Sequence, residues 1–182
     1  MDEKIISASL DEIKIHAFRF TMDDLTRRLH MSKTSLYKIV GSKENLIHEI
    51  ISYIIDEFRA TGAEVENFPP DQKIDRLVEA YAKLFSIFEY GSYNDLQISY
   101  PDEWKRFEKF RDDAIEIFLT VVKNGISQNI FRPINLAVLK RCILTMASTL
   151  TDLDFLSKND LTYSQAIKSF RDLILRGFLK EN

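Results

Sequence analysis

The sequence predicts an all-α protein, and three observations lead to this fold class. Apolar residues make up 45% of the 182 residues and recur at helical spacing along most of the chain. Only five glycines and four prolines interrupt it, which favours long helices over a turn-rich sheet protein. Residues typical of helix caps stand at several breaks between the apolar stretches. At this length, a small helical head and one core of ordinary size fit together.

The first element is a helix at the N-terminus. Ile6, Leu10, Ile13 and Ala17 lie on one stripe of it, so we expect it to pack over the elements that follow. A second helix begins at about Met22, where Thr21 and Asp24 are spaced as in a capping box.

A tight turn and a third helix come next. His30 and Met31 leave two residues of turn before Ser32, which can cap a helix over residues 33–40. Gly41 can adopt the positive φ that ends a helix, and the next residue, a serine, can cap a fourth. Two short capped helices joined by a tight turn form a helix-turn-helix, which predicts DNA binding.

Charge is unevenly distributed around this turn. The chain has a formal net charge of −3, yet residues 25–43 contain five basic residues and no acidic one. A helix that enters a DNA groove needs cations and hydroxyls to hold the phosphates. The side chains that supply this chemistry are Lys33, Thr34, Ser35, Tyr37 and Lys38. The alternative is that the basic residues form an ordinary solvated helix face.

Residues 32–37 (SKTSLY) followed by residues 41–46 (GSKENL) resemble the recognition-helix signature of the TetR family of bacterial transcriptional regulators. The resemblance covers roughly residues 5–50. It implies a helix-turn-helix DNA-binding domain, which we place at residues 1–48. It further implies an all-helical effector-binding and dimerisation domain, which we place at residues 49–182.

The resemblance also implies roles for single residues. Tyr37 and Lys43 would hold DNA phosphates. The residues expected at or near base edges are Lys33, Thr34, Ser35 and Lys38.

Some positions depart from the family pattern. Ala17 and His30 stand where the family usually has glycine, Thr34 where a small residue is common, and Val40 where an aromatic is frequent. A non-glycine residue at positive φ costs about 1 kcal/mol. Asp23 suits the first turn of its helix but would repel a nearby phosphate. These departures bear on the DNA contacts and not on the fold.

Beyond the head, the apolar spacing predicts long helices separated by loops. Gly91 to Asp95 should interrupt the helical pattern, Asn135 should cap one helix, and Thr162 with Gln165 should form a capping box. We expect these helices at about residues 43–60, 71–88, 102–124, 135–156 and 163–178.

The resemblance assigns the last two helices to a homodimer interface. The final helix has an apolar face that includes Ala166, Phe170 and Leu173, broad enough to meet both its own domain and a second copy. The alternative is that this face only covers the core of one chain.

Aromatic residues in the middle helices could line an apolar cavity, although such stripes more often form plain core. Our candidates are Tyr81, Phe85, Phe88, Trp104, Phe107 and Met146. No charged group marks a ligand class, so we expect an uncharged or weakly polar, largely hydrophobic effector.

An enzymatic function has little support, because the sequence lacks nucleotide-binding loops, a nucleophile elbow and a zinc-protease helix. We expect no cofactor and no metal, since His16, His30 and His48 lack metal-ligand spacing. The single cysteine, Cys142, should be a buried small hydrophobe. No apolar run is long enough to span a membrane, and acidic residues follow Met1, so we expect a cytoplasmic protein.

Together these features predict a homodimeric, sequence-specific DNA-binding regulator, a repressor whose operator binding is controlled by a small hydrophobic effector. The alternative is a helical protein-interaction module that has lost specific DNA binding. The altered glycine positions favour that alternative, and DNA affinity with a steep salt dependence would exclude it.

Overall fold

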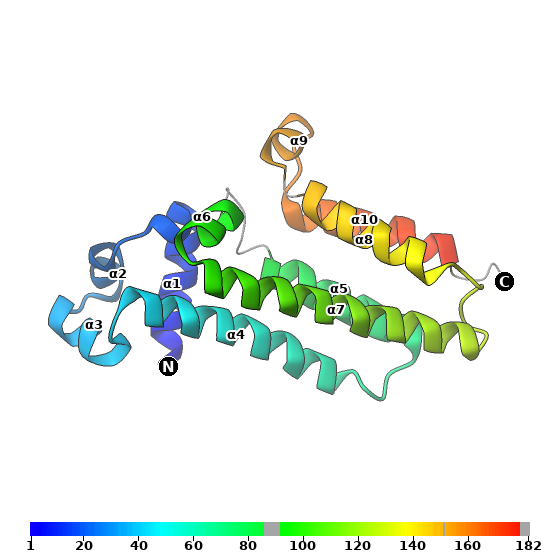
Figure 1. Ribbon diagram of the computed structural model, residues 1–182, viewed down its shortest axis with the longest axis horizontal. Coiled ribbons are helices and arrows are strands. Elements are labelled where there is room, and N and C mark those ends of the chain that lie inside the picture. The colour runs from blue at the N-terminus through cyan, green and yellow to red at the C-terminus, as the bar shows by residue number, and fades with distance from the viewer. Residues whose placement is uncertain (86–91, 151, 179–182) are drawn as a thin grey trace. The chain divides into compact units, whose positions relative to one another are not determined.

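The computed structural model describes residues 1–85, 92–150 and 152–178 (Figure 1). Every regular element in this part of the chain is a helix, which confirms the all-α prediction. The elements are α1 (Glu3–His16), η1 (Ala17–Arg19), α2 (Met22–Leu29), α3 (Lys33–Val40), α4 (Lys43–Glu64), α5 (Pro70–Phe85), α6 (Ser92–Ser99), α7 (Pro101–Ser127), α8 (Leu136–Thr149), α9 (Leu153–Lys158) and α10 (Tyr163–Phe178).

The helices begin where the sequence places their caps. The hydroxyls of Thr21 and Ser32 accept hydrogen bonds from the backbone N–H groups at the starts of α2 and α3. The Asn135 side chain accepts from two N–H groups at the start of α8. Thr162 and Gln165 form a reciprocal capping box at α10, with distances of 2.8 and 3.2 Å. Side-chain caps satisfy donors that a helix leaves open at its N-terminus, and so they fix its first residue.

Two predicted elements differ in the structure. The segment from Gly91 to Asp95 was expected to be a break, but Ser92–Ser99 form the short helix α6. The helix expected over residues 135–156 instead ends at Thr149. The Asp152 carboxylate then accepts hydrogen bonds from Asp154 N and Phe155 N, which starts the separate helix α9.

Contacts divide the chain into two compact units. The head unit comprises the described residues of Met1–Glu57 and Ile87–Lys109, and the second unit those of Phe58–Ser86 and Phe110–Asn182. The head unit therefore contains α6 and the start of α7 in addition to the helix-turn-helix. The functional boundary expected after residue 48 stays a prediction.

The head unit has an apolar core of its own. Ile13 of α1, Leu25 of α2 and Leu36 of α3 are completely buried, as are Leu46 and Ile50 on one face of α4. Burying such side chains stabilises a fold by about 1.5–3 kcal/mol each, so this core holds α2 and α3 in a fixed arrangement.

The second unit is built from the end of α4 and from α5, α7, α8, α9 and α10. Phe58 and Phe110 meet edge to face, with ring centroids 5.3 Å apart. α10 packs against α5, and the completely buried Ile74 of α5 belongs to this core. Phe131 is also buried and lies directly against Gly125 of α7.

Candidate nucleic-acid interface

The helix-turn-helix is fixed at both ends of α2. Thr21 N donates to the Asp24 carboxylate at 2.8 Å, and Asp24 N donates to Thr21 Oγ1 at 3.2 Å. Hydrogen bonds from Thr21 also lower the pKa of Asp24. At the other end, His30 has φ 52° and ψ 41°, a left-handed conformation that ends α2. These local contacts hold the turn in which the chain changes direction toward α3.

The two positions at which the family usually has glycine both have positive φ. Ala17, which follows α1, has φ 52°, and His30 has the same value. Both residues therefore adopt a backbone conformation that favours glycine, and each carries a conformational cost.

α3 presents the candidate DNA-contacting side chains on its exposed face. Leu36 and Val40 are completely buried and fix which face of the helix turns inward. On the outer face, four of the predicted residues together line a shallow surface hollow. They are Lys33, Thr34, Tyr37 and Lys38.

The other two predicted DNA-contacting residues do not line this hollow. The Ser35 hydroxyl lies 2.8 Å from the Ser32 hydroxyl, where it takes part in the cap of α3. Lys43, at the start of α4, has its Nζ 2.8 Å from the Phe18 carbonyl oxygen, to which it donates. Its Nζ also lies 4.6 Å from the centroid of the Phe20 ring, and burial lowers its pKa.

Several of the basic side chains make ion pairs within the head unit. Arg28 donates to the Glu12 carboxylate at 2.6 Å, and Glu12 is only 5% exposed, so this pair fastens α2 to α1. Lys33 pairs with Asp23 at 2.9 Å, and a hydrogen bond from Lys33 to Asp23 raises the pKa of Lys33. The basic run in the sequence predicted one DNA-facing surface, whereas in the structure some of these charges also join helices.

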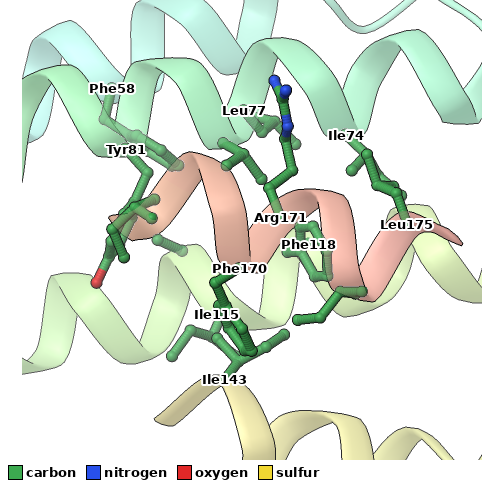
Figure 2. A pocket seen from close by; sticks show the side chains of 14 residues that line it. Phe58, Ile74, Leu77, Tyr81, Ile115, Phe118, Ile143, Phe170, Arg171 and Leu175 are labelled. Carbon is green, nitrogen blue, oxygen red and sulfur yellow. The ribbon is translucent and has the colours of Figure 1, made fainter. Parts of the chain in front are cut away.

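The second unit contains an apolar cavity of about 80 Å³ (Figure 2). This is more than the roughly 10–15 Å³ that one water needs. Its lining comes from five helices and consists of Phe58, Ile74, Leu77, Val78, Tyr81, Ala114, Ile115, Phe118, Ile143, Ile167, Phe170, Arg171, Ile174 and Leu175.

Arg171 is the charged residue in this lining. Its Nη2 pairs with Asp172 at 2.8 Å, and its Nη1 lies 3.8 Å from an Asp75 oxygen. In Figure 2 the guanidinium points toward α5. Two carboxylates therefore offset its charge, which leaves a cavity suited to apolar groups.

Of the predicted ligand-contacting residues, Tyr81 lines the cavity, and burial raises the pKa of its hydroxyl. Trp104 and Phe107 instead belong to the head unit, where both rings lie within about 6 Å of the Tyr93 ring. Met146, on α8, is half-buried and does not line the cavity.

The structure does not test the remaining two candidates, Phe85 and Phe88. Phe85 is the last residue of α5, and nothing is described of its side chain, while Phe88 lies outside the described residues. Phe58, Ile115 and Phe170 line the cavity although they were not among the predicted ligand-contacting residues. Their helical spacing marks buried faces but does not distinguish a cavity wall from filled core.

Cys142 corrects one expectation, because its side chain is exposed on α8 and not buried. Ile143 of α8 lines the cavity, and the neighbouring Cys142 is rotated about 100° around the helix from it, toward solvent. Among the described residues, no three His, Cys, Asp or Glu side chains gather in a way that could hold a metal ion. None of the described helices is long and apolar enough to cross a membrane.

No protein-family model matches the chain. The uncharacterized HTH-type transcriptional regulator YvaF of Bacillus subtilis (strain 168) is 23% identical over 180 residues, which cover 97% of this chain and 95% of that protein.

Several solved structures resemble this chain along nearly its whole length. The TetR family transcriptional regulator PfmR of Thermus thermophilus has a TM-score of 0.70 and 24% identity, with 95% of this chain and 97% of that chain covered. A TetR transcription regulator of Haloarcula marismortui ATCC 43049 has a TM-score of 0.73 and 15% identity, with 98% and 97% covered. These similarities and the helix-turn-helix geometry agree with the resemblance seen in the sequence: the chain has the all-α fold of TetR family transcriptional regulators.

Proposed function

We propose that the chain is a homodimeric transcriptional regulator that binds a specific DNA operator, and a repressor whose binding is controlled by a small apolar effector. The observation that carries this proposal is the exposed face of α3. It presents two lysines, a threonine and a tyrosine in one hollow on a helix whose other face is locked in a core.

In this proposal α3 enters the major groove of the operator. Lys33, Thr34 and Lys38 reach base edges, where hydroxyls and ammonium groups read acceptors such as guanine O6 and N7. Ser35 lies near the bases at the start of the helix. Tyr37 and Lys43 hold phosphates and set the register of α3 on the duplex.

Dimerisation through α8 and α10 would place two copies of α3 on paired half-sites. Val138 of α8 is 59% exposed and Leu173 of α10 is 73% exposed. These apolar side chains, on the outer faces of their helices, are available for a two-fold four-helix interface. The half-sites would be about 34–36 Å apart, or a multiple of that distance.

The effector would occupy the apolar cavity of the second unit. A ligand can regulate only if it binds one conformation better than the other, so this effector would favour the state that cannot bind DNA. The aromatic and aliphatic lining suits a largely hydrophobic molecule, and the paired Arg171 gives no preference for an anion.

The first test is selection of random duplex DNA by the purified protein at near-physiological salt, followed by sequencing of the retained molecules. A two-fold symmetric motif would support the proposal and supply the operator. If DNA were retained but shared no sequence motif, the protein would bind only the DNA backbone, without sequence specificity. If ligand-free protein, refolded to remove any bound effector, retained no DNA, the interaction-module alternative would replace the proposal.

Three variants then test the proposed DNA contacts on that operator. Thr34→Ala should change the preferred bases, since it removes a group at a base edge. Lys43→Ala should weaken binding to all sequences and reduce the slope of log affinity against log salt by about 0.9, because it removes one phosphate-neutralising charge. Lys123→Ala, an exposed lysine of α7 in the second unit, is the matched control and should bind as the wild type does.

A further inference from the structure

Lys43 is held by parts of the head unit that are far apart in sequence. Its Nζ donates to the Phe18 carbonyl at 2.8 Å and lies over the Phe20 ring at 4.6 Å, both in the segment between α1 and α2. Its Nζ also lies 5.9 Å from the centroid of the Tyr100 ring. Tyr100 stands between α6 and α7, outside the helix-turn-helix. One ammonium therefore joins three segments.

Tyr100 is itself fixed against the head. Its ring packs on that of Phe18, with centroids 6.3 Å apart. The helix that precedes Tyr100, α6, is also tied to the head, because Arg19 Nε donates to an Asp95 carboxylate oxygen at 2.8 Å. The Tyr100 ring beside Lys43 thus also has a packing contact that does not involve Lys43.

We propose that Tyr100 is a positioning residue for DNA binding, because its ring and that of Phe20 hold the Lys43 ammonium where it meets a DNA phosphate. The inference rests on the proposed function, in which Lys43 is a phosphate contact. Donation to Phe18 uses one of the three ammonium N–H groups and leaves two for a phosphate oxygen. An ammonium that is already held loses less side-chain freedom on binding than a free one.

Two substitutions separate the ring from the bulk of the side chain. Tyr100→Leu keeps an apolar group but removes the π face, so we expect DNA affinity to fall about three- to ten-fold. Tyr100→Phe keeps the ring, so this variant should bind DNA with the affinity of the wild type. Tyr53→Leu is the matched control, since Tyr53 lies on α4 of the same unit. An unchanged affinity in Tyr100→Leu would overturn the proposal.

A double-mutant cycle distinguishes positioning from general packing. If Tyr100 acts through Lys43, Tyr100→Leu should have no further effect on DNA affinity in a Lys43→Met background. A merely structural role would give the same loss with and without Lys43, and that result would also overturn the proposal.

A readout without DNA separates this inference from the proposed function. Acetylation of Lys43 by a water-soluble, amine-reactive acetylating reagent, followed by mass spectrometry, should be slower than that of exposed Lys38. It should accelerate in Tyr100→Leu but not in Tyr100→Phe. Faster acetylation of Lys43 in Tyr100→Leu, together with DNA binding by the wild type, supports the inference. If the protein binds no DNA at all, the proposed function fails and the positioning role fails with it, while the labelling still reports the contact. Equal labelling in all variants would show that Tyr100 does not hold Lys43.

Discussion

Among the glycines that the structure describes, Gly125 is the one at which an added methyl group would meet the closest neighbouring atoms. A Cβ built there would lie 2.2 and 2.3 Å from two carbons of the Phe131 ring, whereas carbon atoms pack best at about 3.5–4.0 Å. The ring cannot easily retreat, because Phe131 is 1% exposed and its backbone N–H donates to the Gly125 carbonyl at 3.1 Å. Gly125→Ala should therefore force side chains of the second unit out of their packed positions.

The expected magnitude follows from two opposing effects. Overpacking of a filled core costs up to about 3 kcal/mol. Alanine in a helix gains about 1 kcal/mol over glycine, which leaves a net loss of about 2 kcal/mol in the free energy of unfolding. For a chain of this size, that corresponds to a melting temperature lower by roughly 4–8 °C.

Gly62→Ala is the matched control. Gly62 is also helical, and a Cβ there would meet nothing within 4 Å. Its substitution should leave stability unchanged or raise it by up to about 1 kcal/mol. Thermal unfolding followed by far-ultraviolet circular dichroism measures both variants. If Gly125→Ala unfolds at or above the temperature of Gly62→Ala, the close packing against Phe131 is refuted.

Three further predictions concern the head unit. His30→Gly should raise the melting temperature modestly, since an exposed non-glycine residue at φ 52° costs about 1 kcal/mol; no gain would mean that the histidine contributes a compensating contact. Asp23→Asn frees Lys33 and removes a charge that repels phosphate, so fluorescence anisotropy should show tighter binding to random-sequence DNA, and weaker binding would contradict this. Asp24 has a lowered pKa in the folded state, so it stabilises the fold above its unfolded-state value of about 4, and this contribution is lost as pH falls through the lower folded-state value. Melting temperatures of Asp24→Asn measured across that range should depend less on pH than those of the wild type, and an equal dependence would exclude Asp24 as the source.

Local sequence determined the starts of the helices and the helix-turn-helix. A cap such as Thr21 or Ser32 satisfies backbone donors two or three residues away, so the pattern that predicts it is contained in a few letters of the sequence. The same holds for the positive φ at His30 and Gly41, because turn length and residue type limit the backbone there.

Of the two boundaries that differed, the start of α9 has a local cause. α6 forms where glycine and asparagine suggested a break, and α9 separates from α8 because Asp152 caps it. Apolar spacing alone does not distinguish one long helix from two consecutive ones, and only the cap at Asp152 marks the change.

Tertiary structure alone decided how the side chains are used. Sequence spacing placed Trp104 and Tyr81 in one cavity, whereas the fold puts them in different units. It grouped Lys43 with the lysines of α3, whereas Lys43 Nζ binds the Phe18 carbonyl and lies near Tyr100, which is far along the chain. Periodicity shows that a side chain faces inward, but which partner it meets depends on how distant helices pack, and that information is not contained in any local pattern of residues.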